Sequence, residues 1–273
     1  YYRLSGYSYP FRQYDKESRT RSDQFSPKTN LEQVLALYRF DERLRTTTFQ
    51  ELSRIEVGLR ALIGCTLGKD HPYLHLASLQ LGPSGFDKEN NHETDEYRRW
   101  IKSYNINLSR SQEDFIKHYK KEYASKLPIW VAVHILEWGQ LAMLFKMAPI
   151  HCQDSIADSL HLTRPQVNSW LENLRILRNI CAHQGRLFNR TLRQVKLPED
   201  AEILGIRELS PKKNKCFDQL TLVQYLTRTM DLGDGTTLPS VLATFPATDV
   251  VPLRATGTPD NWQSLPLWAC EPT

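Results

Sequence analysis

The stretch RPQVNSWLENLRILRNICAHQGR, residues 164–186, predicts a long amphipathic helix that ends in a turn. At about 100° per residue its apolar side chains fall on one stripe, formed by Val167, Trp170, Leu171, Leu174, Leu177 and Cys181. Thr163 is the expected N-cap and Gly185 the expected C′ residue. Arg178 projects into the same stripe. Because a guanidinium that faces a core costs roughly several kcal/mol unless it has a partner, we expect Arg178 to face a ligand or a cleft.

Helical spacing continues on both sides of this stretch. From the expected N-cap Asn30, apolar residues recur at helical intervals up to Leu67, which predicts one long helix or two joined helices. Shorter helices are predicted at 96–105, 109–124, 151–162 and 217–231, and Pro128 is expected to open an apolar central helix over 129–147. Little of the sequence is typical of a strand. The predicted fold class is therefore all-α, a helical bundle.

The composition changes at both ends of the chain and predicts three parts. Residues 1–29 begin with a tyrosine-rich, non-helical lead-in, residues 30–232 form the helical domain, and residues 233–273 form a tail. Six of the fifteen prolines lie in this tail, so we expect it to pack on the domain in extended form, held by burial of Trp262 and Trp268. The chain starts without methionine, and the lead-in is therefore expected to be the end of a truncated N-terminal segment.

Composition excludes several classes of protein. No run reaches the roughly 18 apolar residues of a membrane helix, and the first residues lack the apolar core of a signal peptide, so we expect a cytoplasmic protein without membrane contact. The five cysteines are widely spaced and indicate neither a disulfide framework nor a zinc site. We expect no cofactor and no metal. The net charge of +4 permits an anionic partner.

Two motifs resemble known sites and fail on inspection. GCTLGKD, residues 64–70, has three residues between its glycines where a phosphate-binding loop has four. His71 and His75 have the spacing of a metal pair, but Pro72 lies between them and no third ligand is near in sequence, which favours a surface turn.

A helix-turn-helix that reads DNA is a further alternative. Residues 155–174 follow its apolar pattern, with the second helix as the recognition helix. The turn lacks the usual glycine, and the second helix continues into the buried stripe that carries Arg178. Because a recognition helix needs an exposed face, we regard DNA binding as the weaker interpretation.

The segment RNICAH, residues 178–183, carries the strongest chemical signal. Arg178 and His183, with Asn179 one helical turn before His183, can converge on one anion if the helix lines a cleft. Arginine supplies a permanent cation suited to phosphate, and histidine exchanges protons near neutral pH. RNA suits such a metal-free group because its own 2′-hydroxyl can act as the nucleophile. The alternative is a structural arginine and a helix-capping histidine.

Other charged and aromatic groups have weaker signals. Arg186, Arg190 and Arg193 follow the motif with no acidic residue between them, and we expect them to hold flanking phosphates. Arg54, Glu56 and Arg60 form either a structural surface group or a set that supports Arg178. The N-terminal tyrosines are expected to pack in the core, with stacking on bases as the alternative.

At RNICAH the sequence resembles the HEPN superfamily, whose signature is Arg, four to six residues and His, commonly with Asn after the Arg. YYRLSGYSYPFR, LYRFDERLR, ELSRIEVGLR, LRNICAHQGRLFNR and TPDNWQSLPLW together resemble the Abi-like bacterial abortive-infection proteins of the AbiD and AbiF type, from Tyr1 to Trp268. The resemblance implies a HEPN-like helical bundle, a cytoplasmic bacterial setting, a homodimer with facing motifs, and a role in phage defence or as a toxin restrained by a small non-coding RNA.

Carried over by position, the resemblance makes Arg178, Asn179 and His183 the catalytic residues of a metal-independent endoribonuclease that cleaves single-stranded RNA. Many HEPN-like domains bind RNA or a partner without cutting. A non-catalytic RNA-binding or dimerisation module therefore stays the alternative.

Overall fold

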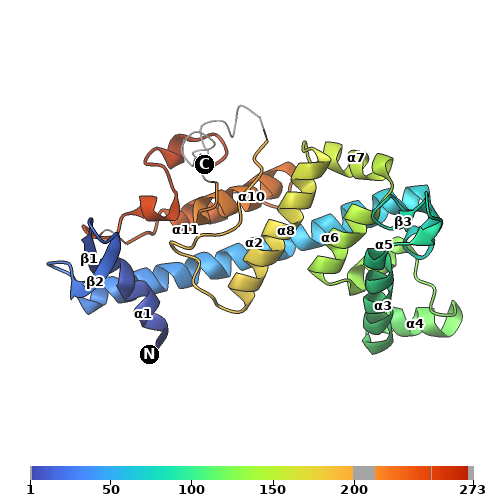
Figure 1. The fold of residues 1–273 in the computed structure, drawn as a ribbon, viewed down its shortest axis with the longest axis horizontal. Helices are drawn as coiled ribbons and strands as arrows, with labels where there is room; N and C mark the ends of the chain where they lie inside the picture. The colour runs from blue at the N-terminus through green and yellow to red at the C-terminus, as the bar shows by residue number, and fades with distance from the viewer. Residues whose placement is uncertain (1, 199–212, 247, 270–273) are drawn as a thin grey trace. The chain divides into compact units, whose positions relative to one another are not determined.

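The computed structural model describes residues 2–198, 213–246 and 248–269, and most of these are helical, as predicted (Figure 1). The α-helices are α1 Tyr2–Ser8, α2 Leu31–Asp70, α3 Asp95–Arg110, α4 Asp114–Glu122, α5 Ile129–Ala132, α6 Trp138–Met147, α7 Ile150–Ser159, α8 Arg164–Ala182, α10 Cys216–Thr229 and α11 Thr237–Leu242. The strands are β1 Arg12–Asp15, β2 Thr20–Phe25, β3 Phe86–Asp87 and β4 His92–Glu93, and they pair as two antiparallel hairpins.

The helix predicted from Asn30 is a single one, α2, which spans 40 residues. Asn30 caps it as expected, because its Oδ1 accepts the backbone N–H of Gln33 while the Gln33 side chain accepts the N–H of Asn30. The fully buried positions recur along its length at helical spacing, at Leu37, Phe40, Leu44, Leu52, Ile55, Leu59, Ile63 and Leu67.

The described chain divides into two compact units. Unit 1 comprises residues 1–53 and 176–273, and unit 2 comprises residues 54–175. Both α2 and α8 contribute residues to each unit, and the division expected at residues 29 and 232 stays a prediction.

Unit 1 is built around α10. Its residues from Cys216 to Thr227 are all buried, so α10 is the helix that is enclosed on every side. The C-terminal segment packs on it, since Gln224 donates to the carbonyl of Leu267 and the ring of Trp268 stacks on Phe217 at 4.6 Å between centroids.

Of three expectations for the ends of the chain, the structure corrects two and confirms one. The lead-in was expected to be non-helical, but residues 2–8 form α1, and β1 and β2 follow as a hairpin. The tail is not extended throughout, because it contains α11. Burial of Trp262 and Trp268 is confirmed, with 6% and 1% of their surfaces exposed.

In unit 2, the helix predicted over residues 129–147 is broken. It forms α5, a short 3-10 turn and then α6, which begins after Glu137. Glu137 and Gln140 form a reciprocal capping box, in which each side chain accepts a backbone N–H of the other's residue. This cap favours a new helix start over continuation, although the apolar pattern runs through the break.

The glycines of GCTLGKD have a packing role in α2. A Cβ at Gly68 would lie 2.6 Å from the Trp130 ring, and one at Gly64 would lie 3.1 Å from the Trp130 Cα. Both positions therefore need glycine so that α5 can approach α2 closely. Close packing of the two helices therefore accounts for the spacing of these glycines, and no phosphate-binding role is needed to explain it.

His75 is in the core, so the predicted surface turn is correct only for His71. The side chain of His75 has no exposed surface, and neither ring nitrogen has a hydrogen-bond partner within the part of the chain that the structure describes. Its ring meets the edges of Tyr104 and Trp100, whose rings stack on each other at 5.6 Å. Burial lowers the pKa of His75 to about 3.

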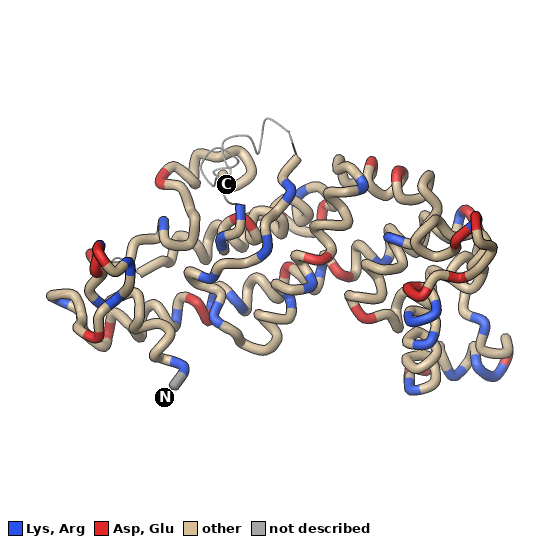
Figure 2. The backbone as a smooth tube through the Cα atoms, viewed as in Figure 1, with Lys and Arg blue, Asp and Glu red and all other residues tan. Residues whose placement is uncertain are grey.

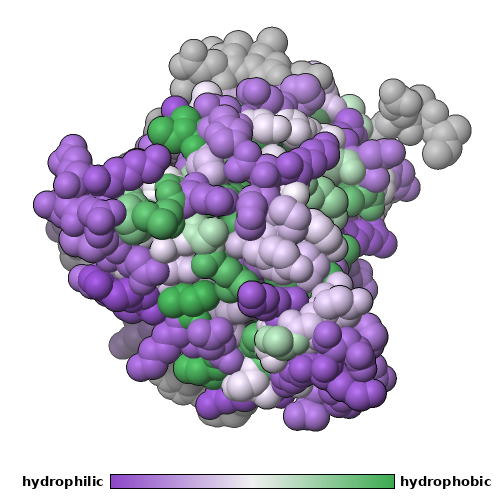
Figure 3. All heavy atoms as spheres, turned by 90° about the vertical axis from the view of Figure 1, so that its right-hand side faces the viewer, coloured by the Kyte–Doolittle hydropathy of each residue, from purple (hydrophilic) through white to green (hydrophobic). Residues whose placement is uncertain are grey.

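Among the described helices, none combines the length and the apolar character that crossing a membrane requires. On the face drawn in Figure 3, hydrophobic patches are small and lie between hydrophilic side chains.

We predict that His75 makes the protein acid-labile. The unfolded chain binds a proton at this residue below about pH 6.5 and the folded chain does not, so stability is fully present above about pH 6.5 and falls by about 1.4 kcal/mol per pH unit as the pH drops toward 3. Urea unfolding as a function of pH should give a shallower acid slope for His75→Phe than for wild type. The exposed His118, changed to Phe, is the control and should keep the wild-type slope. Equal slopes for all three proteins would contradict the prediction.

Candidate active site

Arg178 lies in the last turns of α8, on the side where Leu174 and Leu177 are fully buried. The side chain as a whole is half-buried, and its Nε is buried without a hydrogen-bond partner among the described residues. The guanidinium carbon is 6.0 Å from the centroid of the Phe49 ring on α2, at the outer limit of a cation–π contact. The prediction that this charge projects into the apolar stripe is confirmed.

Asn179 and His183 are the neighbours of this charge along the helix. The Oδ1 of Asn179 lies 3.5 Å from the NH1 of Arg178, a weak contact that leaves the amide available to other partners. The backbone N–H of His183 donates to the carbonyl of Asn179. The imidazole of His183 is exposed, directly after the last residue of α8.

The end of α8 is set by a left-handed residue, but not by the predicted glycine. Gln184 has φ 54°, its N–H donates to Cys181, and the N–H of Gly185 donates to Ile180. This is the Schellman pattern. Gln184 occupies the C′ position that was predicted for Gly185, and Gly185 occupies the next position, C″. This pattern holds His183 directly after the C-terminal end of α8, where the negative end of the helix dipole lies.

A buried carboxylate holds the loop that follows. Asp41 on α2 has no exposed surface and accepts the backbone N–H of Phe188 at 2.6 Å and that of Leu187 at 3.2 Å. Its second oxygen accepts a hydrogen bond from Tyr7 and forms an ion pair with Arg45, which is 4% exposed. The carboxylate is thus fully satisfied inside the core.

The first helix is tied to the same loop. The Arg186 guanidinium donates to the carbonyl of Gly6 on α1, and Arg3 donates to both the side chain and the backbone carbonyl of Gln184. Because one donor of Arg186 is held in this way, its guanidinium is positioned by unit 1 itself.

Two neighbours of Asp41, Tyr7 and Cys181, have raised pKa values and are uncharged near neutral pH. Burial, reinforced by Asp41, raises the pKa of Tyr7 far above its usual value of 10. Burial and then Asp41 raise the pKa of Cys181 to about 12. The cysteine within RNICAH is therefore a packed thiol and has no role as a nucleophile.

Sequence reasoning missed Asp41, Arg45 and Tyr7 as a group. The available signal was Asp41, which falls between Phe40 and Leu44 on the buried side of α2, where a charge needs a partner. The pattern gave no indication of which distant backbone amides would satisfy it.

Comparison with known proteins shows the family to which this chain belongs. The family model described as Abi-like protein matches residues 1–189. The chain belongs to the Abi-like protein family. No curated protein and no solved structure gives a significant match. Membership in the Abi-like family associates the chain with abortive infection.

The Abi-like match has a structural counterpart. YYRLSGY, LYRFDERLR and RNICAHQGRLF, which are distant in sequence, meet in one network, because Gly6 and Tyr7, Asp41 and Arg45, and residues 184–188 contact one another. The family match ends at residue 189, just after the loop that Asp41 holds.

The remaining predicted site residues lie outside this network. Arg190 and Arg193 are exposed in the segment after the Abi-like match, so their predicted role rests on charge alone, and it stays a prediction. Figure 2 shows Lys and Arg along this segment.

Arg54, Glu56 and Arg60 belong to unit 2. Arg60 pairs with Glu56 and donates to the carbonyl of Leu136 at 2.8 Å, which is the structural pairing that the sequence left open. A supporting role of these residues toward Arg178 stays a prediction.

We predict that Asp41→Ala lowers the free energy of unfolding by about 3–5 kcal/mol, because it leaves the buried Arg45 and two backbone amides without their acceptor. Hydrogen exchange should show lost protection at the amides of Leu187 and Phe188. Glu42→Ala removes the same charge from the exposed neighbour and should change stability by less than about 0.5 kcal/mol. Equal effects of the two substitutions would show that Asp41 does not hold the loop.

Proposed function

We propose that this chain is a metal-independent endoribonuclease that cleaves single-stranded RNA and acts in abortive infection, restrained by a small non-coding RNA. The observation that carries the proposal is Arg178, a half-buried cation whose Nε has no partner among the described residues, on the same helix end as the exposed His183. The resemblance of RNICAH to the HEPN signature supports the same assignment.

The reaction is an internal transesterification. The 2′-oxygen forms a bond to phosphorus while the bond from phosphorus to the 5′-oxygen breaks, so the products are a 2′,3′-cyclic phosphate and a 5′-hydroxyl. The 2′-hydroxyl loses one proton and the leaving 5′-oxygen gains one. His183 donates the proton to the 5′-oxygen.

The other residues stabilise charge and position the phosphate. Arg178 binds the non-bridging oxygens, on which negative charge increases in the transition state. Asn179 orients the phosphate or the imidazole from the preceding turn of the helix. Arg186 and Arg190 hold flanking phosphates, with Arg186 already oriented by Gly6.

The chain acts as a homodimer in this proposal. Two RNICAH segments then face each other, so that the Arg178 of one copy and the His183 of the other act on the same phosphate, and water takes up the proton that the 2′-hydroxyl loses. The RNA phosphate bound in this arrangement is the anionic partner that Arg178 lacks among the described residues.

The first test is cleavage of end-labelled single-stranded RNA in EDTA, with identification of the product termini. Wild type should leave cyclic-phosphate ends, and Arg178→Ala and His183→Ala should each lower the rate by about 10²–10³-fold. Arg175→Ala, which removes another arginine of α8 that pairs with Glu172, and His118→Ala are controls and should cut like wild type.

Two outcomes would overturn this proposal. Products with 5′-phosphate ends would exclude attack by the 2′-hydroxyl. RNA binding without cleavage by wild type and by both variants would favour the non-catalytic binding module. Circular dichroism in the same EDTA buffer establishes that each protein is folded.

A second test addresses the shared site. Mixing inactive Arg178→Ala with inactive His183→Ala should restore part of the activity, because a mixed dimer contains one intact Arg178 and one intact His183. A site confined to one chain predicts no recovery at any mixing ratio. Recovery should depend on protein concentration as subunits exchange.

A further inference from the structure

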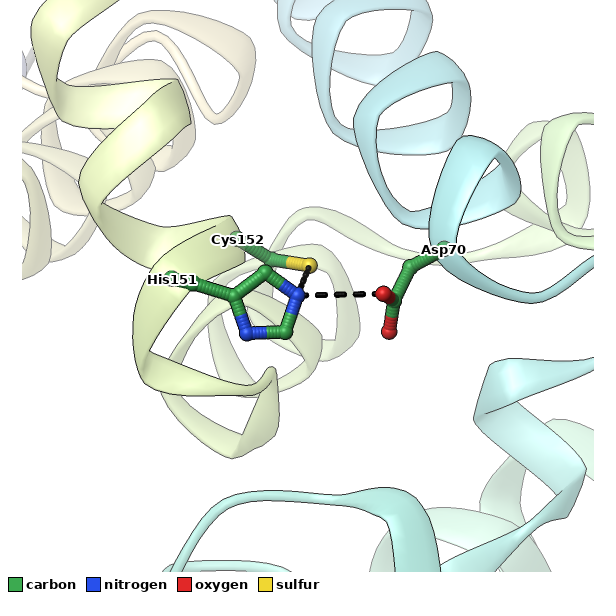
Figure 4. A group of neighbouring side chains, drawn as sticks. All are labelled: Asp70, His151 and Cys152. Carbon is green, nitrogen blue, oxygen red and sulfur yellow. Dashed lines mark hydrogen bonds and ion pairs between the residues drawn. The ribbon is translucent and has the colours of Figure 1, made fainter.

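Three potential metal ligands of unit 2 lie together although they are distant in sequence. Asp70 is the last residue of α2, and His151 and Cys152 are in the first turn of α7 (Figure 4). The His151 Nε2 lies 3.1 Å from the Asp70 Oδ1 and 3.3 Å from the Cys152 Sγ. All three ligand atoms lie within 4.8 Å of one another.

We propose that Asp70, His151 and Cys152 form a Zn²⁺ site that joins the end of α2 to the start of α7, with water as the fourth ligand. Zinc bonds of about 2.0–2.1 Å to nitrogen and oxygen and about 2.3 Å to sulfur place neighbouring ligand atoms about 3.4–3.6 Å apart in a tetrahedron. The separations of 3.1 and 3.3 Å are within a few tenths of an ångström of these values.

The chemistry of the ligands selects the ion. A thiolate, an imidazole and one carboxylate suit zinc, whereas Mg²⁺ and Ca²⁺ prefer sets composed of oxygen atoms. Figure 4 shows the imidazole edge turned toward both the thiol and the carboxylate. Among the described residues, this is the one group of three or more such side chains close enough to share an ion.

The exposure of the ligands shows where the fourth coordination position of the ion is open to solvent. The His151 side chain is 68% exposed and that of Asp70 is 37% exposed, so solvent reaches the ion from their side. Cys152 is 2% exposed, so the third ligand lies in the protein interior. Three protein ligands and an accessible fourth position are the arrangement in which zinc keeps a bound water.

The same three residues do not form a thiol nucleophile. Burial, and then Asp70, raise the pKa of Cys152 to about 11, so the thiol is protonated near neutral pH in the absence of a cation. A catalytic cysteine needs the opposite surroundings, which lower the pKa of its thiol.

The test uses the full chain, stripped of metal and then titrated with Zn²⁺ alone, without RNA. One zinc per chain should remain after dialysis, the melting temperature should rise by about 5 °C or more, and millimolar Mg²⁺ should not displace the ion. Co²⁺ in place of Zn²⁺ should give the charge-transfer absorption of a thiolate ligand.

Variants identify the ligands. His151→Gln and Asp70→Asn change exposed side chains, so they should fold, and each should weaken zinc binding by about 100-fold or more. Cys152→Ser should lose the cobalt absorption. Cys65→Ser and His134→Gln alter an exposed cysteine and an exposed histidine of the same unit and should bind zinc like wild type.

The proposal is wrong if the stripped wild-type chain, after titration with Zn²⁺ and dialysis, holds much less than one zinc per chain. It is also wrong if His151→Gln and Asp70→Asn bind as tightly as wild type, or if Cys65→Ser removes the cobalt absorption. These readouts involve no RNA, so they do not depend on the proposed ribonuclease activity.

Discussion

The buried carboxylate of Asp41 is the interaction on which unit 1 depends. A charge in the core is tolerated only when its oxygen atoms are fully hydrogen-bonded, and here Arg45, Tyr7 and the amides of residues 187 and 188 supply the donors. These donors come from α1, α2 and the loop after α8. Removing Asp41 takes away the acceptor that all of these donors share. The direction of that loop, and the place where α8 ends, are therefore linked to one side chain.

This constraint bears directly on the candidate active site. The backbone reverses at Gln184 and is then held by the contacts of Arg186 with Gly6 and of the next two amides with Asp41. His183 consequently stands exposed at a defined helix end, while Arg178 lies inward beside Phe49. The hydrogen bonds that hold this loop in the core thus also fix the chain directly after His183.

Much of the architecture could be predicted because helices are local structures. The buried stripe of α8, the Asn30 cap and α10 follow from spacing and capping residues. The break at Glu137 was missed because a local capping box outweighed a continuous apolar pattern. The turn at Gln184 was misplaced by one residue because glycine is only the commonest left-handed residue, and other contacts can stabilise a different one there. The cluster of Asp70, His151 and Cys152 was missed because Asp70 is 81 residues away from His151 in the sequence.

The sequence by itself determined that the chain is mostly helical, that Arg178 faces the apolar stripe of its helix, and that an arginine, an asparagine and a histidine share one helix end. Each of these depends on spacing within a single helix, which sequence periodicity records. Only the tertiary structure decided that Asp41 is satisfied by amides 146 and 147 residues away, and that Asp70 meets His151 and Cys152. Such pairings depend on how separate elements pack, and at Asp41 burial leaves the charged side chain no partners other than those that packing brings.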